Sequence, residues 1–502
     1  MLSKLLKKVN LFKEIDYFKK RNVLKKIYDT DISLLKEELN NYFYKNLFFK
    51  NFDVSKYSKP VLDKLVYLYK KYNFFVYNDI KIILFILSAC GSLENFKFFY
   101  EIFKKKYSNE EETLKNIFLV SILYDNIDVF KFLAFNNKEK KIIEIIINDK
   151  IGTSIFLLAA RYGSIKILNY FISKGIDINI KDEDYKRTAL MWAAIEGNLE
   201  AVKLLIESGA NLSETDDGGY TAVTIASIYN NVEILKLLIE SVTDPNERSS
   251  QLKKAFLKSA ENEQINTFEF LLNKILEGRK EIKGNEEIKK YNNEYLNAKD
   301  IGGRTALILS VLWSDSCIKI LKMLIESGAD INAKDNEGKT ALMHVAERGY
   351  VKKAKLLIES GANLDEKDND NKKTALFYAV EKNKVEVVKL LIESGANLEE
   401  QKLYGETALM VAAYNNYLDI VYLLIKGGAD LEKKDNGGST ALMYAAINRD
   451  SNLKVVELLV KNGAKIDETD NSGKTAIDYA KTNEIKQFLL RELEKQKKNQ
   501  KI

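Results

Sequence analysis

The stretch Asn336-Glu337-Gly338-Lys339-Thr340-Ala341-Leu342-Met343, closed further on by Leu357-Ile358-Glu359-Ser360-Gly361-Ala362, decides the fold of this 502-residue chain. Its Thr-Ala dipeptide returns at spacings of 33, 84, 35, 34, 33, 33 and 35 residues. The copies begin at Thr188, Thr221, Thr305, Thr340, Thr374, Thr407, Thr440 and Thr475. A period near 33 residues means that each unit cannot bury its apolar face alone and must stack on its neighbours. The sequence therefore predicts an elongated array that presents surface.

Each part of the unit has a mechanical interpretation. The hydroxyl of Thr340 is placed to cap the first helix, and Gly338 permits a positive φ in the turn before it. The second helix ends at Leu-Ile-Glu-Ser-Gly-Ala, in which the glycine supplies the left-handed residue that terminates a helix. This hexapeptide begins at Leu205, Leu324, Leu357 and Leu391. Small pairs such as Ala412 and Ala413 let the paired helices approach closely.

The length of the unit, its turn, its cap and its Gly-Ala terminator resemble the ankyrin repeat family. The resemblance implies an all-α solenoid of stacked helix pairs with β-turn connections. One difference from the family is consistent, because the family's Thr-Pro-Leu-His becomes Thr-Ala-Leu-Met at Thr188, Thr340 and Thr440. The sole histidine, His344, lies one place past the family's histidine position. We expect the fold to survive, since alanine is a good first-turn residue.

The array is predicted over residues 151–482. In the long gap after Thr221, the segment 254–260 falls 33 residues later in the same pattern, so one degenerate repeat lies there. The following residues 279–296 are rich in Glu, Lys and Asn, and we expect an exposed, mobile inserted loop.

Upstream of the array the pattern weakens. The segment 121–129 echoes 226–234, which predicts degenerate helix pairs over 80–150. Residues 1–79 lack the period and are predicted to form a helical cap, and residues 483–502 a last helix with a charged tail. The basic, amphipathic start, residues 1–27, leaves open a second interpretation, contact with an anionic membrane surface.

Composition excludes several classes of protein. The net charge of +6 comes from the two ends, while residues 28–483 are slightly acidic, so we expect no nucleic-acid partner for the array. The two cysteines, Cys90 and Cys317, cannot build a disulfide framework or a Cys-rich zinc site. No apolar run is long enough for a transmembrane helix. We expect a cytoplasmic monomer, with signal-independent export into a host left open.

Catalytic chemistry finds little support in the sequence. Because the chain has a single histidine, Ser-His-Asp, Cys-His and His-based zinc sites are excluded. We assign that histidine, His344, a packing role. Gly338-Lys339-Thr340 lacks the first glycine of a phosphate-binding loop and is explained by the repeat's own turn and cap. The sequence therefore predicts no catalytic residues, no bound cofactor and no metal.

The resemblance to ankyrin repeats implies a non-enzymatic scaffold that binds a partner protein on its concave face. The family's recognition positions lie just before the capping Thr and just after the paired small residues. Five of the eight turn positions are basic, which suggests an acidic patch on the partner. The partner-binding candidates are Arg187, Ile195, Tyr220, Tyr229, Arg304, Trp313, Lys339, Arg348, Lys373, Tyr414, Asn448 and Lys474.

An alternative function stays open from the sequence. The chain could be an effector or toxin-like protein in which residues 1–150 carry an unrecognised activity and the repeats target it. This segment has no histidine, a single cysteine and no recognisable motif.

Overall fold

The structure, a computed structural model, describes residues 84, 87–88, 93–106, 117–118, 120–135, 155–315, 318–447 and 453–499. Contacts divide the chain into two units, Met1–Ile146 and Ile147–Ile502, and each is described by itself. The cap expected over residues 1–79 lies outside the described residues, as does Asn448.

The first unit has an aromatic core around α5 (Leu93–Lys106) and α7 (Ile127–Phe135). The rings of Phe118 and Phe130 lie 5.2 Å apart between centroids. Burial, together with the charge of Glu101, raises the pKa of the Tyr100 hydroxyl. The fully buried aromatic side chains here are Phe96, Phe99, Tyr100, Phe103, Phe118 and Phe130.

The turn before α7 has the geometry of a turn in the second unit. Asp125 and Asn230 both have positive φ, 54° and 60°. The following side-chain amides donate to a carbonyl of the preceding segment, Asn126 to Leu87 at 3.5 Å and Asn231 to Ala194 at 2.6 Å. The two segments that echo one another in sequence therefore share a local structure, while the extent of helix pairs over 80–150 stays a prediction.

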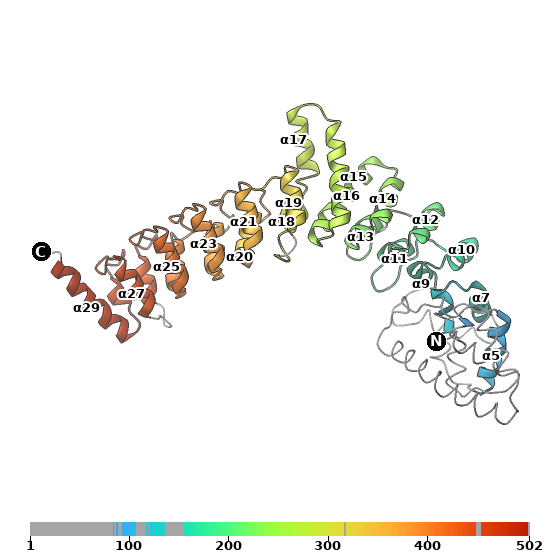
Figure 1. The fold of residues 1–502 in the computed structure, drawn as a ribbon, viewed down its shortest axis with the longest axis horizontal. Helices are drawn as coiled ribbons and strands as arrows, with labels where there is room; N and C mark the ends of the chain where they lie inside the picture. The colour runs from blue at the N-terminus through green and yellow to red at the C-terminus, as the bar shows by residue number, and fades with distance from the viewer. Residues whose placement is uncertain are drawn as a thin grey trace, which may run out of the picture. The chain divides into compact units, whose positions relative to one another are not determined.

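The second unit is a succession of helix pairs, as Figure 1 shows. Among the described residues there is no β-strand, and isolated bridges join Lys181 to Thr188 and Lys299 to Thr305. The all-α prediction is confirmed. The regular pairs are α9 (Ile155–Tyr162) with α10 (Ile165–Ser173), α11 (Ala189–Glu196) with α12 (Leu199–Glu207), α13 (Ala222–Ile228) with α14 (Val232–Ser241), α20 (Ala341–Arg348) with α21 (Val351–Glu359), α22 (Ala375–Glu381) with α23 (Val385–Glu393), α24 (Ala408–Tyr414) with α25 (Leu418–Lys426), α26 (Ala441–Ile447) with α27 (Leu453–Lys461), and the terminal α28 (Ala476–Tyr479) with α29 (Asn483–Asn499).

A methionine thioether completes the cap of several first helices. The N–H of Met343 donates to Thr340 Oγ1 at 3.4 Å, and the N–H of Thr340 donates to Met343 Sδ at 3.5 Å. Sulfur is a weak acceptor, but it satisfies a backbone donor that would otherwise be buried without a partner. The arrangement recurs at Thr188 with Met191 and at Thr407 with Met410. Methionine thus takes over the position where the family pattern has histidine.

The turns of successive repeats are bonded to one another. Asp335 accepts the N–H groups of Glu337 and Lys339 at 3.0 and 2.8 Å, which folds the turn around its own carboxylate. The N–H of Asn369 in the next turn donates to the Glu337 carbonyl at 2.9 Å. Gly338 sits at this close approach with φ 79°, and a Cβ there would lie 2.7 Å from the backbone N of Asn369. Only glycine fits this position without displacing the next repeat.

The ends of the second helices follow the expected pattern. The N–H of Ala362 reaches the Leu357 carbonyl at 3.0 Å and that of Gly361 reaches Ile358 at 3.0 Å, with Gly361 at φ 89°. This is a left-handed termination by glycine, as predicted. The alanine pair Ala412 and Ala413 is buried, which allows the close helix contact expected from the sequence.

The array changes at residues 245–315, which we call the interrupted region. Its helices are α15 (Pro245–Glu261), α16 (Ile265–Lys280), α17 (Asn285–Glu294) and α18 (Ala306–Leu309), with α19 (Lys319–Glu326) following. We call residues 335–447 the regular repeats. The degenerate repeat predicted at 254–260 is present, but its first helix begins much earlier than that segment. Asp244 causes this early start, since its carboxylate caps the helix by accepting the N–H groups of Asn246 and Glu247 at 2.7 and 2.9 Å.

The loop expected at 279–296 is instead helical over most of its length. The rings of Tyr291 on α17 and Tyr295, the residue that follows this helix, stack with centroids 4.5 Å apart. Lys253 of α15 lies 2.8 Å from the Glu294 carboxylate and over the Tyr295 ring. None of the α17 residues is buried, whereas Leu296 at the end of the predicted insertion is 1% exposed. Figure 1 shows α17 projecting from the succession of pairs.

Candidate functional site

The predicted recognition residues differ in how far they reach solvent. Tyr229, Trp313 and Tyr414 are 47%, 65% and 47% exposed, which is high for large apolar side chains. Lys474 is exposed as well. The half-buried candidates are Arg187, Ile195, Tyr220, Arg304, Lys339, Arg348 and Lys373. The last candidate, Asn448, lies outside the described residues.

Four of the five basic turn residues are paired with carboxylates of this same chain. Their partners are Asp216 for Arg187 at 3.4 Å, Asp300 for Arg304 at 2.7 Å, Glu337 for Lys339 at 3.0 Å and Glu381 for Lys373 at 2.8 Å. The positive row seen in the sequence is therefore largely neutralised within the fold.

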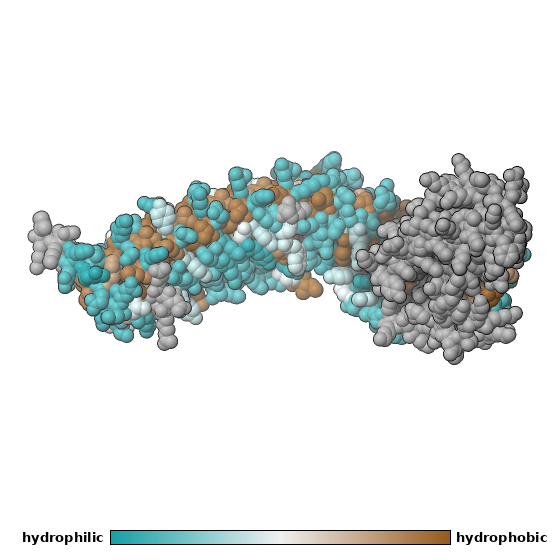
Figure 2. Space-filling view, turned by 60° about the horizontal axis from the view of Figure 1, so that its bottom comes forward, coloured by the Kyte–Doolittle hydropathy of each residue, from teal (hydrophilic) through white to brown (hydrophobic). Residues whose placement is uncertain are grey.

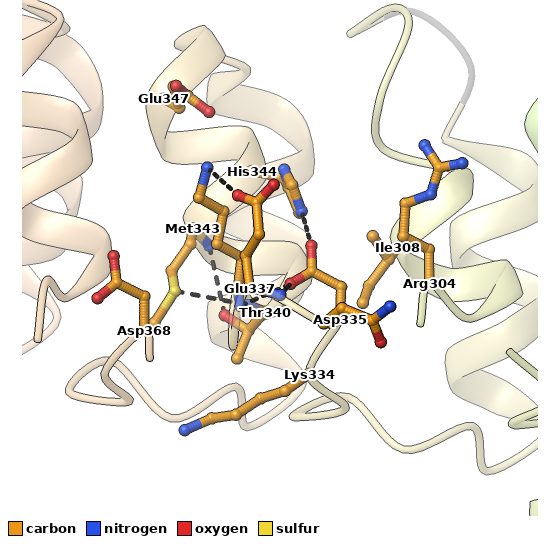
Figure 3. Close-up of polar contacts among 12 residues, drawn as sticks. Arg304, Ile308, Lys334, Asp335, Glu337, Thr340, Met343, His344, Glu347 and Asp368 are labelled. Atoms are coloured by element: carbon orange, nitrogen blue, oxygen red, sulfur yellow. Dashed lines mark hydrogen bonds and ion pairs between the residues drawn. The ribbon is translucent and has the colours of Figure 1, made fainter. Parts of the chain in front are cut away.

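A buried pair joins the turn of several repeats to its first helix. His344 Nε2 lies 2.8 Å from Asp335 Oδ2, and both side chains are buried. Figure 3 draws this contact as a dashed line. Burial alone would raise the pKa of the Asp335 carboxyl, but hydrogen bonds from His344 and from the Lys339 and Glu337 N–H groups outweigh it and hold the pKa below its ordinary value. The packing role assigned to His344 thus includes this hydrogen bond.

Other repeats make the same bond with another donor. Trp192 donates to Asp182 at 2.7 Å, Tyr378 to Asp368 at 2.7 Å and Tyr444 to Asp435 at 2.7 Å. Burial and the bonded carboxylates raise the pKa of the Tyr378 and Tyr444 hydroxyls. Because a Trp, a Tyr or a His can serve, the position requires a donor that bridges the helix to the turn, and nothing in it requires acid–base chemistry.

The structure brings part of the predicted face together in one groove. This groove, which we call the α15 groove, has a volume of about 590 Å³. It is lined by Arg187 and Tyr220 from two turns, Ile225, Ile228 and Tyr229 of α13, Lys258, Glu261, Asn262 and Glu263 at the end of α15, and Trp313. Four of the predicted recognition residues, Arg187, Tyr220, Tyr229 and Trp313, thus share a site. Tyr414 lies on a later repeat, 6.2 Å from the Tyr444 ring.

The α15 groove lies where the array lacks a turn. Helix α14 ends at Ser241 and α15 begins at Pro245, so no turn projects between them. The start of α15 packs on the preceding repeat instead, where the Thr221 hydroxyl donates to Gln251 Oε1 at 3.3 Å. Lys253, one period after Tyr220, is directed to Glu294 of α17. At the end of α15, Asn262 is exposed and Lys258, Glu261 and Glu263 are half-buried.

Charges in the α15 groove are paired. Lys258 Nζ lies 2.6 Å from Glu261 Oε2, and the Ser314 hydroxyl donates to Glu263 at 3.0 Å. Burial alone would lower the pKa of Lys258, but its contacts with Glu261 and Tyr220 outweigh it and raise that pKa. The α15 groove therefore offers aromatic and aliphatic surface between fixed, mutually neutralised charges.

The residues at the end of α15 were missed by the sequence analysis. A signal was present, since Ser259 and Ala260 are the paired small residues of the degenerate repeat and Glu261 and Asn262 follow them. The recognition rule extended to that repeat finds both.

Figure 2 shows one face of the array, on which an apolar band runs between hydrophilic margins. Within the described residues no group of His, Cys, Asp or Glu side chains comes together in a way that could hold a metal ion. In the same part of the chain, no helix combines the length and apolar character needed to cross a bilayer.

Three curated proteins illustrate what the chain is similar to. It is 29% identical over 184 residues to palmitoyltransferase AKR1 of Lachancea kluyveri, covering 35% of this chain and 22% of that protein. It is 26% identical over 215 residues to phosphocholine transferase AnkX of Legionella pneumophila, covering 42% and 17%. It is 33% identical over 127 residues to arginine ADP-riboxanase OspC1 of Shigella flexneri, covering 24% and 25%. The chain thus spans a quarter or less of each of these proteins.

Family models match most of the second unit. A model described as ankyrin repeats (3 copies) matches residues 156–249, 190–283, 322–402, 365–435 and 409–501, and one described as ankyrin repeat matches 302–336. The matched segments include the regular repeats and the interrupted region except residues 284–301, which contain α17. With the 33-residue period, the bonded turns and the stacked helix pairs, they show that the chain belongs to the ankyrin repeat family.

Proposed function

We propose that the chain is a non-enzymatic scaffold that binds a partner protein through the turns and the ends of the first helices. The observation that carries this proposal is the exposure of Tyr229, Trp313 and Tyr414 on repeats whose cores are otherwise closed. Large aromatic side chains dominate the energetics of protein interfaces, whereas a largely exposed one gains little of its apolar burial within the fold. Ankyrin repeats also support a protein-interaction role.

The partner chemistry that we propose differs from the acidic patch that the turn charges alone suggest. An acidic partner patch would have to compete with Asp216, Asp300, Glu337 and Glu381, which already hold the turn cations. We therefore propose that aromatic contacts anchor the partner. Acidic groups of the partner would contact only the periphery of the interface, near Lys474. We propose that the chain acts as a monomer in a reducing, cytoplasmic compartment, either of its own cell or of a host after export.

Capture of partners from the native host tests this proposal. The full chain is the bait, and a variant with Tyr229, Trp313 and Tyr414 all changed to alanine is the matched control. A partner of the proposed kind binds the full chain and loses at least tenfold in affinity with the variant, while the melting temperature stays the same. Equal binding by both baits would contradict the proposal.

A second candidate function is an effector whose N-terminal residues 1–150 modify a protein that the repeats recruit. The observation that favours it is the similarity to AnkX and OspC1, whose names describe transferase and riboxanase enzymes. Mass spectrometry of the captured partner separates the two candidates. A covalent mass increase that appears only after incubation with the full chain supports the effector, and an unchanged mass supports the scaffold.

A further inference from the structure

We propose that the α15 groove is the main anchoring site for the partner and that it takes an uncharged protein segment carrying a large aromatic or aliphatic side chain. The proposal deepens, and rests on, the proposed function as a protein-binding scaffold. It also assigns Lys353, which lies outside the α15 groove, the role of positioning two of its walls.

The first argument is the apolar content of the α15 groove. Trp313 and Tyr229 are the most exposed aromatic residues that line it, and Ile228, which also lines it, is half-buried. A partner side chain placed among them would remove apolar surface from water on both molecules, at about 25 cal/mol per Å². This is the arrangement expected of a central anchor in a protein interface.

The second argument is electrostatic. Arg187 is paired with Asp216 at 3.4 Å, Lys258 with Glu261 at 2.6 Å, and Glu263 with Lys353 at 3.8 Å. An anionic or cationic ligand would have to break one of these pairs and leave a partly buried charge without its partner, which is costly. An uncharged segment keeps all three pairs and is therefore preferred.

The third argument concerns the size of the occupant. Pockets for small molecules enclose most of the ligand surface. Here Trp313 is 65% exposed, so a small molecule in the α15 groove would remain largely in water. A protein segment covers the rim as well as the interior, and it can bury both Trp313 and Tyr229.

Lys353 connects two walls of the α15 groove from the next repeat. Its side chain is fully buried, and its Nζ donates to the Ser310 carbonyl at 2.8 Å and lies 3.8 Å from Glu263 Oε1. Its backbone N–H donates to Asp315 at 3.3 Å. The Tyr350 hydroxyl, from the residue before α21, donates to the Trp313 carbonyl at 2.8 Å. Lys353 thus ties the end of α15 to the loop that carries Trp313.

Burial of this ammonium has a physical meaning. A buried charge is tolerated when it is paired and hydrogen-bonded, and it rarely adds net stability over an apolar side chain. Lys353 contacts Glu263 at the end of α15 and the Ser310 carbonyl of the loop that carries Trp313. Its ammonium group therefore fixes the distance between these two walls of the α15 groove. We therefore expect its replacement to change the shape of the α15 groove and also to lower the stability of the array, because the Ser310 carbonyl and Glu263 lose this partner.

The experiment is a selection of random peptides displayed on phage against the full chain, followed by binding measurements with synthesised peptides. We expect enriched peptides to be rich in aromatic and aliphatic residues and to have no net charge. Their Kd should rise at least tenfold for Trp313→Ala and for Tyr229→Ala. It should change less than twofold for Tyr414→Ala, a matched exposed aromatic on a later repeat.

A fluorescence measurement locates the peptide independently. The chain has two tryptophans, and Trp192→Tyr leaves Trp313 as the sole one while keeping a donor for Asp182, as Tyr378 does for Asp368. Bound peptide should reduce acrylamide quenching of Trp313 severalfold. Unchanged quenching under saturating peptide would overturn the proposal.

The role of Lys353 is tested by Lys353→Met, with Lys355→Met on the same helix as the control. Lys355 is 63% exposed in its side chain. In the Trp192→Tyr background, Lys353→Met should shift the Trp313 emission of the free protein and raise the peptide Kd at least tenfold, and Lys355→Met should do neither. A lowered melting temperature with unchanged Kd and emission would show that Lys353 is merely structural.

The outcomes separate this inference from the proposed function. Peptides that bind through Tyr414 and ignore Trp313 would overturn the α15 groove as the anchoring site and leave the scaffold function standing. Strongly acidic or basic peptides that require Trp313 would overturn the uncharged partner. Failure to recover any peptide that binds the full chain would overturn the α15 groove as a site for a protein segment, and the capture experiment would still decide the scaffold function.

Discussion

The regular repeats and the interrupted region are built from the same helix pair, but their polar groups have different partners. In the regular repeats each turn bonds the next one, as Asn369 does with the Glu337 carbonyl at 2.9 Å. In the interrupted region one turn is replaced by the start of α15, and Lys253 pairs with Glu294 of the projecting α17. The comparison shows that a repeat can lose polar contacts with its neighbours and expose more surface while its apolar core stays intact.

The core of both regions is closed to the same degree. Phe377 in the regular repeats and Phe256 in the interrupted region are 1% and 0% exposed. The two regions therefore differ in their connections, and experiments that separate core from connection can break or sharpen the comparison.

The largest expected effect is the loss of a core phenylalanine. Phe377→Ala and Phe256→Ala should each cost about 3–5 kcal/mol, since each leaves a cavity in a close-packed core. Stability in a repeat array spreads mainly to nearest neighbours. Hydrogen exchange should therefore show Phe256→Ala opening α15 to α18 while the regular repeats keep their protection. Equal loss of protection in both regions would show that the interruption does not separate them.

The next effect concerns the donor that bridges turn and helix. Tyr378→Phe leaves the Asp368 carboxylate, which is 3% exposed, without its hydroxyl donor. The expected cost is about 1–3 kcal/mol, because a buried charged acceptor loses a partner. Urea unfolding measures it, with Tyr404→Phe as the control, since Tyr404 is 68% exposed. A destabilisation of equal size in the control would contradict the assignment.

Acid should weaken the equivalent bridge of another repeat, in which Asp335 is bonded to His344. The pKa of Asp335 is lowered in the folded state, so its bonds contribute stability that is fully present above the unfolded pKa of about 3.8 and is lost as the pH falls through the folded value. Urea midpoints between pH 5 and pH 2.5 should fall less steeply for Asp335→Asn than for the unchanged chain. Parallel pH profiles would mean that other carboxylates dominate acid unfolding.

The smallest effects are expected from exposed ion pairs. Lys319, just after the interrupted region, and Glu269, within it, are 56% and 49% exposed in their side chains. Lys319→Ala should cost less than about 1 kcal/mol, because water screens the pair. Lys334→Ala should cost somewhat more, since Lys334 also donates to the Lys367 carbonyl at 3.0 Å. Reversal of this order in thermal melts would show that the bonded turns add little to the regular repeats.

The fold was predictable because the same local sequence signals recur in many periods. The capping Thr, the turn glycine and the Gly-Ala terminator each act locally, so one copy explains the others. The helical insertion was missed because charge and Asn content were interpreted as a loop, although Tyr291 and Tyr295 stand one helical turn apart. The early start of α15 was also missed, although Asp244 followed by Pro245 is a helix-start signal.

The candidate site was predictable only residue by residue. The recognition rule found Tyr220, Tyr229 and Trp313, but their meeting in the α15 groove depends on the absence of a turn, which the rule does not describe. The neutralisation of Arg187 by Asp216 depends on the stacking of two turns 29 residues apart. Pairing of this kind is a property of tertiary geometry.

The thioether caps have a further use as chemical reporters. Met191, Met343, Met410 and Met443 are each 1% exposed and stand at the same place in four repeats. Peroxide converts methionine to its sulfoxide, and it can reach these sulfur atoms only while a first helix is open. The oxidation rate of each methionine, followed by peptide mass analysis, would therefore time the opening of each repeat in the unmodified protein.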